Sequence, residues 1–254
     1  RSRGLGDVYK RQVIGDLGGF VAATYMRGID FYNLPTTLLA MVDSSVGGKV
    51  AVDLDGYKNI VGTFYQPRAV LADPCVLQTL DARQYACGMA EIIKMFATSD
   101  AAMFARLEDR SACISREELI CAALRIKMAV VEADEREGGL RRVLNFGHTV
   151  GHAVESISAR QPYPLLHGEC VSIGMLAMTD GEVRRRLTRL LHRYDLPTAF
   201  RCGRDDLCAV LAHDKKAGAD GITTVRVPEI GRFTLQKEST DDILGSCGEV
   251  ISFL

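Results

Sequence analysis

The stretch Arg141-Arg-Val-Leu-Asn-Phe-Gly-His-Thr-Val-Gly-His152 decides how the rest of this sequence is interpreted. It places His148 and His152 one helical turn apart, and Leu166-His-Gly-Glu169 follows shortly after. Arg141 and Asn145 lie upstream and would share the face of the histidines if the helix begins before them. Only five histidines occur in the chain, and three of them fall in this window. Such a concentration is hard to attribute to packing, and it indicates a metal-dependent enzyme.

Composition excludes several other classes of protein. A chain of 254 residues allows one large domain or two modest ones. Its formal net charge is −1 with acids and bases interspersed, which argues against a nucleic-acid partner. No apolar run is long enough for a membrane span. The eight cysteines form no C-x-x-C pair, so we expect neither a zinc knuckle nor a disulfide framework, and we predict a cytoplasmic protein.

The pattern of apolar residues changes along the chain near residue 82. Before it, short predicted strands at 31–35 and 70–73 alternate with helices at 21–27 and from Thr36 onward, as in an α/β layer. After it, helical spacing dominates over 82–98, 116–133, 144–158 and 169–191, and a hairpin over 222–235 precedes a last helix from Thr240. We therefore predict an α/β portion over 13–82, a partial Rossmann-like domain, followed by an all-α domain over 83–254. The glycines Gly15, Gly18 and Gly19 are expected to permit close backbone approach.

A catalytic zinc ion commonly has three protein ligands and one open position. His148 and His167 can supply two of them, and Glu91 offers a carboxylate within an apolar helix, where Lys94 shares its face. Taken alone, the Glu91–Lys94 pair is better explained as a buried salt bridge. Taken with the three histidines, it favours a metal site.

Several cationic and polar residues predict an anion-binding pocket. Asp43-Ser-Ser-Val-Gly-Gly-Lys49 combines a carboxylate, hydroxyls and a lysine, and Lys58-Asn59 follows one loop later. Lys127 lies on the apolar face of a predicted helix, where it needs a counter-charge or an anionic ligand. Arg141 can bind phosphate or carboxylate with two hydrogen bonds. Together these residues describe a pocket for a small, doubly anionic, polyhydroxylated substrate.

These motifs resemble the 3-dehydroquinate synthase family, and they occur in that family's order. The resemblance rests on the segments Val13-Ile-Gly-Asp-Leu-Gly-Gly-Phe20, Leu34-Pro-Thr-Thr37, Val42-Asp-Ser-Ser-Val-Gly-Gly-Lys49, Lys58-Asn59, Ala90-Glu-Ile-Ile-Lys94, Asp134-Glu-Arg-Glu137, Leu144-Asn-Phe-Gly-His148 and Leu166-His-Gly-Glu169. The segment around Asp43 favours this enzyme over the sister cyclases of aminocyclitol biosynthesis. The resemblance implies conversion of 3-deoxy-D-arabino-heptulosonate 7-phosphate to 3-dehydroquinate and phosphate, a step of the shikimate pathway, with NAD and Zn²⁺ or Co²⁺ as cofactors.

The resemblance also implies roles for individual residues. The expected metal ligands are Glu91, His148 and His167. The expected catalytic and substrate-binding residues are His152, Lys94, Lys127, Arg141, Asn145, Asp43, Lys49, Lys58, Asn59 and one of Lys215 and Lys216. On the NAD side, the resemblance implies Gly15, Asp16, Thr36, Thr37 and the turn from Leu77 to Thr79, with Lys49 and Lys58 bordering both ligands. His152 is the candidate for proton transfer. A homodimer is also expected.

Residues 1–12 match nothing in the family, and we expect them to be a leader that does not belong to it. The family carries a further block before Val13 and a glycine run where this chain has Lys10-Arg-Gln12. We therefore expect a truncated chain with weakened NAD binding and an exposed sheet edge and apolar surface.

Three alternatives stay open from the sequence. One is a metal-dependent alcohol dehydrogenase of the glycerol-dehydrogenase type, which would leave the lysines and Arg141 unexplained. Another is a related cyclase that makes an inosose or a valiolone. The third is an inactive metal-binding fragment.

Overall fold

The computed structural model describes residues 10–54, 57–213 and 221–254. The expected leader over 1–12 therefore falls mostly outside the described residues. The α/β portion begins with α1 (Lys10–Thr24) and a 3-10 turn, Tyr25–Arg27. Strand β1 (Tyr32–Asn33) pairs in parallel with β4 (Ala69–Val70), and β2 (Lys49–Leu54) forms an antiparallel hairpin with β3 (Tyr57–Phe64). A π-helical turn, Ala40–Ser44, and a 3-10 helix, Pro74–Thr79, complete this portion.

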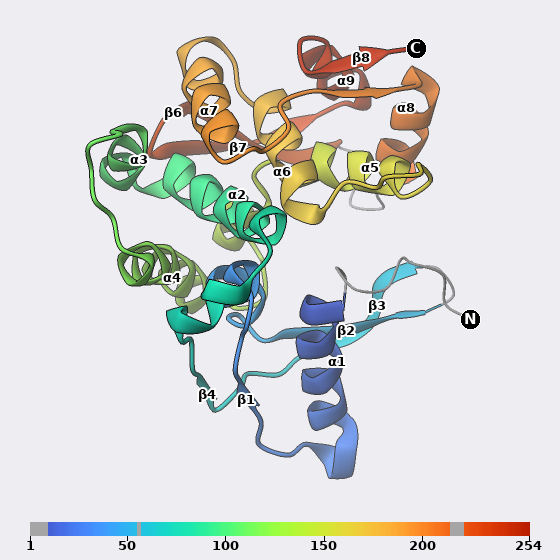
Figure 1. The fold of residues 1–254 in the computed structure, drawn as a ribbon. Helices are drawn as coiled ribbons and strands as arrows, with labels where there is room; N and C mark the ends of the chain where they lie inside the picture. Colours follow the sequence, from blue (N-terminus) through green and yellow to red (C-terminus); the bar gives the residue numbers. More distant parts are fainter. Residues whose placement is uncertain (1–9, 55–56, 214–220) are drawn as a thin grey trace.

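The second portion is mainly helical, and most of it lies above the α/β portion in Figure 1. Its helices are α2 (Ala82–Ser99), α3 (Ala101–Glu108), α4 (Arg116–Ala133), α5 (His148–Ser158), α6 (His167–Ala177), α7 (Gly181–Arg193), α8 (Arg204–His213) and α9 (Thr240–Cys247), with a 3-10 segment over Leu140–Asn145. An antiparallel hairpin joins β6 (Ile222–Glu229) to β7 (Arg232–Glu238). Strand β5 (Phe200–Cys202) pairs in parallel with β8 (Ile251–Phe253). The predicted α/β portion followed by helices is confirmed.

Four predicted helices differ from the structure. The helix over 21–27 is the end of the longer α1 and the 3-10 turn after it, and the helix from Thr36 contains the π-helical turn Ala40–Ser44. The helix over 144–158 begins only at His148, because Gly147 at its N-cap has a φ of +76° and breaks the chain direction after the 3-10 segment. Arg141 and Asn145 therefore do not lie on the same helix as the histidines. The helix over 169–191 is in fact two helices, α6 and α7, which are separated by a turn around Thr179 and Asp180. The hairpin β2–β3 and the helices α3 and α8 were not predicted.

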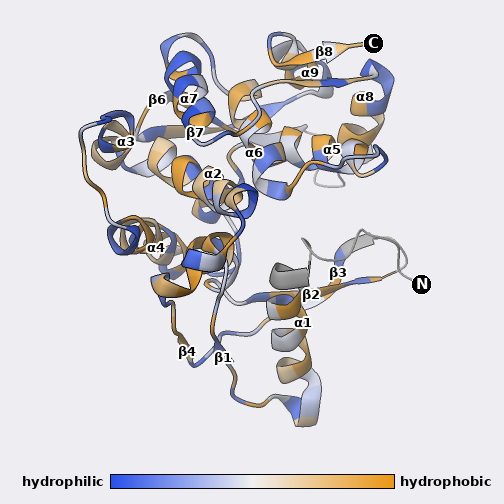
Figure 2. Ribbon diagram, in the orientation of Figure 1, coloured by the Kyte–Doolittle hydropathy of each residue, from blue (hydrophilic) through white to orange (hydrophobic). Residues whose placement is uncertain are grey.

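The core is built around α2 and α6. Every residue of α2 from Ala86 to Thr98 is buried, and every residue of α6 after His167 is buried as well. A helix that is apolar on all sides belongs in the interior of a protein. Figure 2 shows apolar segments along α2 and where α5 passes α6. Any charged group on α2 is therefore held in a dry, tightly packed environment.

Glycines let α5 and α6 approach each other closely. A Cβ atom on Gly174 would lie 1.9 Å from the carbonyl oxygen of Gly147, and one on Gly151 would lie 3.1 Å from the carbonyl oxygen of Cys170. No side chain can be placed at Gly174 without moving a backbone. The result is that side chains at the starts of both helices face one another.

The α/β portion exposes many large apolar side chains, as expected. Ile14, Tyr25, Met26, Leu34 and Leu71 are each more than half exposed. The expectation of close backbone approach holds at only one of the three glycines in α1. A Cβ on Gly19 would lie 2.4 Å from Val50, whereas one on Gly15 or Gly18 would meet no atom within 4 Å.

Among the described residues, no helix combines the length and the apolar character that crossing a membrane requires.

The α5–α6 contact yields a stability prediction. We expect Gly174→Ala to lower the free energy of unfolding by about 2–3 kcal/mol, because the added methyl group has no space against the Gly147 carbonyl. Gly245→Ala in α9 is the matched control, since a Cβ there meets nothing within 4 Å, and alanine favours a helix over glycine. Chemical denaturation measures both variants. Equal stabilities of the two would contradict this account of the helix contact.

Candidate functional site

Three side chains from three helices meet in the buried centre of the helical portion. Glu91 comes from the middle of α2, and His148 and His167 are the first residues of α5 and α6. Nε2 of His148 lies 3.7 Å, and Nε2 of His167 lies 3.5 Å, from Oε1 of Glu91. Atoms bound about 2.1 Å from a tetrahedral zinc ion lie roughly 3.4 Å apart, so the spacing suits such an ion. These are the three residues that the sequence predicted to be metal ligands.

The carboxylate of Glu91 is fully buried, and neither of its oxygens accepts a hydrogen bond of normal geometry. Its neighbours are cationic or can bind cations: Lys94 forms an ion pair with it, and the two imidazoles lie on the other side. Burial raises the pKa of Glu91, but Lys94 and the imidazoles outweigh that effect and hold it well below its ordinary value. The structure therefore contains both expected features. Glu91 forms a salt bridge with Lys94, and the two imidazoles converge on Glu91.

The surroundings shift the pKa values of the two imidazoles in opposite directions. Burial and the nearby Lys94 ammonium lower the pKa of His148 well below its ordinary value, and its Nδ1 lies 3.1 Å from the carbonyl oxygen of Phe146. Burial also acts to lower the pKa of His167, but Glu155 and Glu91 raise it to about 9. A metal ion must displace a proton from any protonated ligand, so metal binding at His167 is coupled to pH.

The N-terminus of α6 is fixed by a second ion pair. Glu169 accepts two hydrogen bonds from Arg83 of α2, at 2.6 and 2.7 Å, and a third from the backbone N–H of Leu166. Arg83 also donates to the carbonyl of Pro164 in the preceding loop. This network holds His167, the first residue of α6, against α2. The sequence identified Glu169 as part of a motif, but it did not identify Arg83.

Lys127 has the counter-charge that the sequence required, whereas Arg141 contacts backbone carbonyls and not a carboxylate. Lys127 is 5 % exposed, and its Nζ lies 2.6 Å from Oδ1 of Asp43, which supplies the required counter-charge. Burial lowers the pKa of Lys127, and contact with Asp43 opposes that shift. The guanidinium of Arg141 donates to the backbone carbonyls of Gly47 and Glu135 and lies over the ring of Phe64. Arg141 is positioned by the turn that contains Gly47, and Lys127 is positioned by Asp43 in the π-helical turn before it.

Glu137 is a site residue to which the sequence assigned no role. Its carboxylate forms an ion pair with Lys49 and accepts a hydrogen bond of 2.5 Å from Asn145. Glu137 has a φ of +61°, a conformation rare for residues other than glycine. The motif Asp134-Glu-Arg-Glu137 was the available signal, because Asp134 accepts backbone hydrogen bonds from Gly138, Gly139 and Arg141 and so shapes this turn.

Two cavities lie on either side of the Lys49–Glu137 pair. One, of about 410 Å³, is lined by a set that includes Asp16, Asp43, Lys49, Asn59, Lys127 and Arg141. The other, of about 360 Å³, is lined by a set that includes Glu137, Asn145, His148 and His152. The ring of His152, which is exposed, lies 5.1 Å from that of His148. Most of the predicted substrate-binding side chains therefore line one of these two cavities, and the second of them reaches the cluster around Glu91 at His148.

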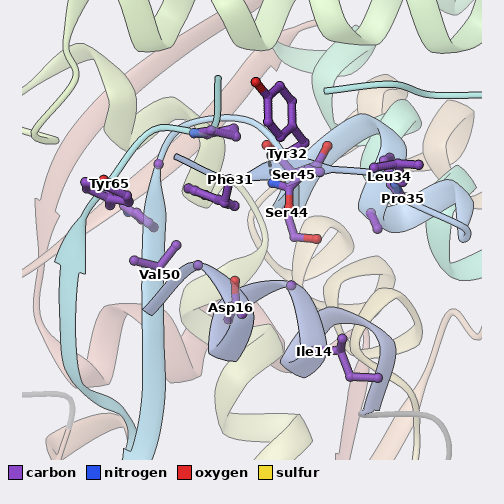
Figure 3. Close-up of a pocket in the computed structure, with 18 of the residues that line it drawn as sticks. Ile14, Asp16, Phe31, Tyr32, Leu34, Pro35, Ser44, Ser45, Val50 and Tyr65 are labelled. Atoms are coloured by element: carbon purple, nitrogen blue, oxygen red, sulfur yellow. Dashed lines mark hydrogen bonds between the residues drawn. The ribbon is translucent and has the colours of Figure 1, made fainter. Parts of the chain in front are cut away.

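A third cavity, of about 510 Å³, lies between α1 and the loop after β1 (Figure 3). Gly15, Asp16, Thr36, Thr37 and Lys49 line it, together with the aromatic side chains of Phe31, Tyr32 and Tyr65. Its volume lies in the range of small-molecule and cofactor sites. Asp16 and Lys49 also line the 410 Å³ cavity, so the two spaces share a wall.

Some of the predicted residues do not join these cavities. Leu77 is buried in the apolar core and Thr79 is exposed, and neither lines the 510 Å³ cavity. The side chain of Lys58 and both Lys215 and Lys216 lie outside the described residues.

Asp16 gives a pH prediction. Burial, and after it repulsion by Asp43, raises the pKa of Asp16 to about 6 from 3.8. The unfolded chain therefore loses this proton at lower pH than the folded chain, so the carboxyl destabilises the fold as pH rises from about 4 to about 6. We expect Asp16→Asn to gain stability relative to the unchanged chain over this window, by on the order of 1–3 kcal/mol. Urea titrations at pH 4.5 and pH 7.5 measure the gain. A constant difference between the two chains would contradict the raised pKa.

Comparisons with known proteins agree with this geometry. The family model described as 3-dehydroquinate synthase N-terminal matches residues 11–87, and the model described as 3-dehydroquinate synthase C-terminal matches residues 88–217. The solved structure of 2-epi-5-epi-valiolone synthase from Streptomyces hygroscopicus, with NAD⁺ and Zn²⁺ bound, is 28% identical with a TM-score of 0.81 and covers 92% of this chain and 70% of its own. A 2-deoxy-scyllo-inosose synthase with carbaglucose-6-phosphate, NAD⁺ and Co²⁺ is 27% identical with a TM-score of 0.80, over 94% of this chain and 71% of its own.

Relatives in other organisms are more similar in sequence. The 3-dehydroquinate synthase of Clostridium acetobutylicum is 44% identical and covers 89% of this chain and 67% of its own length. That of Desulforamulus reducens is 44% identical over 91% of this chain and 69% of its own length. The chain thus spans about two thirds of the length of these relatives. On this evidence, the chain belongs to the 3-dehydroquinate synthase family.

Proposed function

We propose that this chain converts 3-deoxy-D-arabino-heptulosonate 7-phosphate to 3-dehydroquinate and phosphate, as a carbon–oxygen lyase of the shikimate pathway. The observation that carries the proposal is the Glu91–His148–His167 cluster, which reaches the 360 Å³ cavity at His148, together with Lys127, Arg141 and Lys49 on the wall of the 410 Å³ cavity. A phosphorylated sugar acid needs cationic groups for two anions and a centre that acts on a hydroxyl group. Glycerol carries no anion and would leave these cations unexplained.

The residues fit the expected cofactors. Glu91, His148 and His167 would hold Zn²⁺ or Co²⁺, since the carboxylate oxygens are buried without hydrogen-bond donors of normal geometry and the imidazoles face them. The 510 Å³ cavity, with Gly15, Asp16, Thr36 and Thr37 along it, would hold NAD. When bound, the cation lowers the pKa of a coordinated hydroxyl group, and NAD accepts a hydride and returns it.

The cations of the chain bind and orient the substrate. Lys127 and Arg141 lie on the wall of the 410 Å³ cavity, each held in place by a carboxylate or by backbone carbonyls. Lys49 and Asn59 line the same cavity, and Lys58, in β3, is proposed to act with them. Such preorganised positive charge stabilises the phosphate as its C–O bond breaks and the electron pair leaves with oxygen. One of Lys215 and Lys216 is proposed to bind the same phosphate.

Proton transfer is assigned to His152. This residue lies on α5 one turn after His148, and it lines the 360 Å³ cavity. Asn145 lines that cavity too, and Glu137 holds it by a hydrogen bond. We propose that His152 transfers protons to and from substrate oxygens and that Asn145 orients them. The departing phosphate can take the proton from the carbon next to the ketone.

Two further assignments accompany this function. We propose an NAD-binding portion up to about residue 82 and a metal- and substrate-binding portion after it, supported by the start of α2 at Ala82. The turn from Leu77 to Thr79 is proposed to contribute to NAD binding through its backbone. We also propose a cytoplasmic homodimer; all eight cysteines are free thiols, which suits a reducing compartment.

The direct test is phosphate release from the heptulosonate phosphate, measured with NAD and Co²⁺ or Zn²⁺ added singly and together. We expect release only when both are present, formation of 3-dehydroquinate, and no oxidation of glycerol. A calorimetric NAD titration alongside shows whether the cofactor binds. His148→Ala is the control and should abolish metal-dependent release. Glycerol oxidation, or an inosose or valiolone product from a different sugar phosphate, would contradict the proposal.

The buried pair of Glu91 and Lys94 gives a second prediction. In metal-free protein, we expect Glu91→Ala to lower the free energy of unfolding by about 3–5 kcal/mol, because Lys94 is left as a buried charge without its partner. The double variant Glu91→Gln/Lys94→Met should recover much of this loss but should bind no metal. Denaturation and metal titration separate the two effects. A double variant as unstable as Glu91→Ala would contradict the explanation.

A further inference from the structure

We propose that Glu155 is a positioning residue for the metal centre. It holds the imidazole of His167 at Nδ1, so that Nε2 faces Glu91 and the cation. This inference rests on the metal site proposed above and adds a residue that does not itself bind the metal.

His167 lies between two buried carboxylates. Its Nε2 is 3.5 Å from Oε1 of Glu91, and its Nδ1 is 3.7 Å from Oε2 of Glu155. Glu91 is 0 % exposed and Glu155 is 5 % exposed. Each ring nitrogen of this one histidine therefore faces a different acid, one on α2 and the other on α5.

The sequence of α5 explains how Glu155 reaches this place. His148, His152 and Glu155 follow one another at spacings of four and three residues, so they lie along one face of the helix. The glycine contacts between α5 and α6 bring that face against the start of α6. The neighbours of Glu155 on α5, Ala153, Val154 and Ile157, are buried and apolar, and a carboxylate among them is costly unless it meets a donor.

The chemistry of a histidine ligand explains why the ring of His167 would donate a hydrogen bond to Glu155. A neutral imidazole has one N–H group and one lone pair, and an acceptor on one nitrogen directs the lone pair of the other toward the metal. Phe146 provides this acceptor for His148, through its carbonyl at 3.1 Å from Nδ1. Glu155 would provide it for His167. The separation of 3.7 Å is about 0.8 Å longer than a typical N–H···O hydrogen bond, so the proposed role requires it to shorten when a cation binds.

The same side chains allow one other arrangement. His152, Glu155 and His167 also have possible ligand atoms within 4.8 Å of one another, as a second cation site would require. His152 is exposed, however, and His167 can direct only one lone pair to a metal while its other nitrogen carries a proton. The positioning role is therefore favoured, and the number of bound ions distinguishes the two arrangements.

The test measures Zn²⁺ and Co²⁺ binding to the full chain by chelator competition and counts the ions by calorimetry. Glu155→Leu removes the acceptor at similar volume, and we expect it to weaken binding 10- to 100-fold. Glu155→Gln, whose amide oxygen can still accept a hydrogen bond, should lose less. Glu132→Gln, an exposed residue of α4 with the same change of charge, is the matched control and should bind as the unchanged chain does.

A second readout separates positioning from a purely structural role. In the Co²⁺-loaded protein, the ring N–H protons of bound histidines give shifted, exchangeable NMR signals. We expect the signal of His167 to exchange faster with water in Glu155→Gln and to be lost or broadened in Glu155→Leu. Unfolding of the metal-free variants is measured in parallel.

Three results would overturn the inference. The positioning role is removed if the Glu155→Leu variant folds and keeps both its metal affinity and its His167 signal. If the Glu155→Leu variant does not fold, unchanged affinity and signal in Glu155→Gln have the same meaning. Binding of two ions, of which Glu155→Leu loses one, makes Glu155 a ligand. Absence of any metal binding by the unchanged chain defeats the proposed metal centre and this inference together, whereas the first two results leave that centre intact.

Discussion

A single buried carboxylate organises the helical portion of this molecule. Glu91 is fully buried on a helix that is itself buried on all sides, and a charge in that position needs compensation by several groups. Lys94 compensates it from the same helix, and the imidazoles of His148 and His167 approach it from α5 and α6. A bound cation would complete the set. The need to satisfy this carboxylate therefore ties three helices to one point.

The packing of α5 and α6 places His148 and His167 beside Glu91. Gly147 turns the chain so that α5 begins at His148, and Gly174 lets α6 lie against that turn with no side chain between them. Arg83 and Glu169 hold the start of α6 to α2 by an ion pair with two hydrogen bonds. The glycines and this ion pair do not line the three cavities, but they determine where the proposed metal site lies.

The electrostatics of the site are balanced in pairs. Lys127 is held by Asp43, and Lys49 by Glu137, so each cation has a partner before any substrate binds. These ion pairs hold the two cations in fixed positions. Asp16 and Lys49 stand on the wall shared by the two larger cavities, which would place a cofactor beside the reacting part of a substrate.

The sequence by itself determined the type of the main elements, and it predicted most of the residues that line the cavities and the buried cluster. Helices over 82–99 and 116–133 follow from local apolar spacing, and the histidine window and the lysine motifs are local patterns too. Only the tertiary structure decided what depends on contacts between distant segments. The break before His148, the division of 169–191 into two helices, and the roles of Glu137, Glu155 and Arg83 belong to that group. Each arises from a partner far away in sequence or from a backbone angle at one glycine, and neither leaves a periodic signal along the chain.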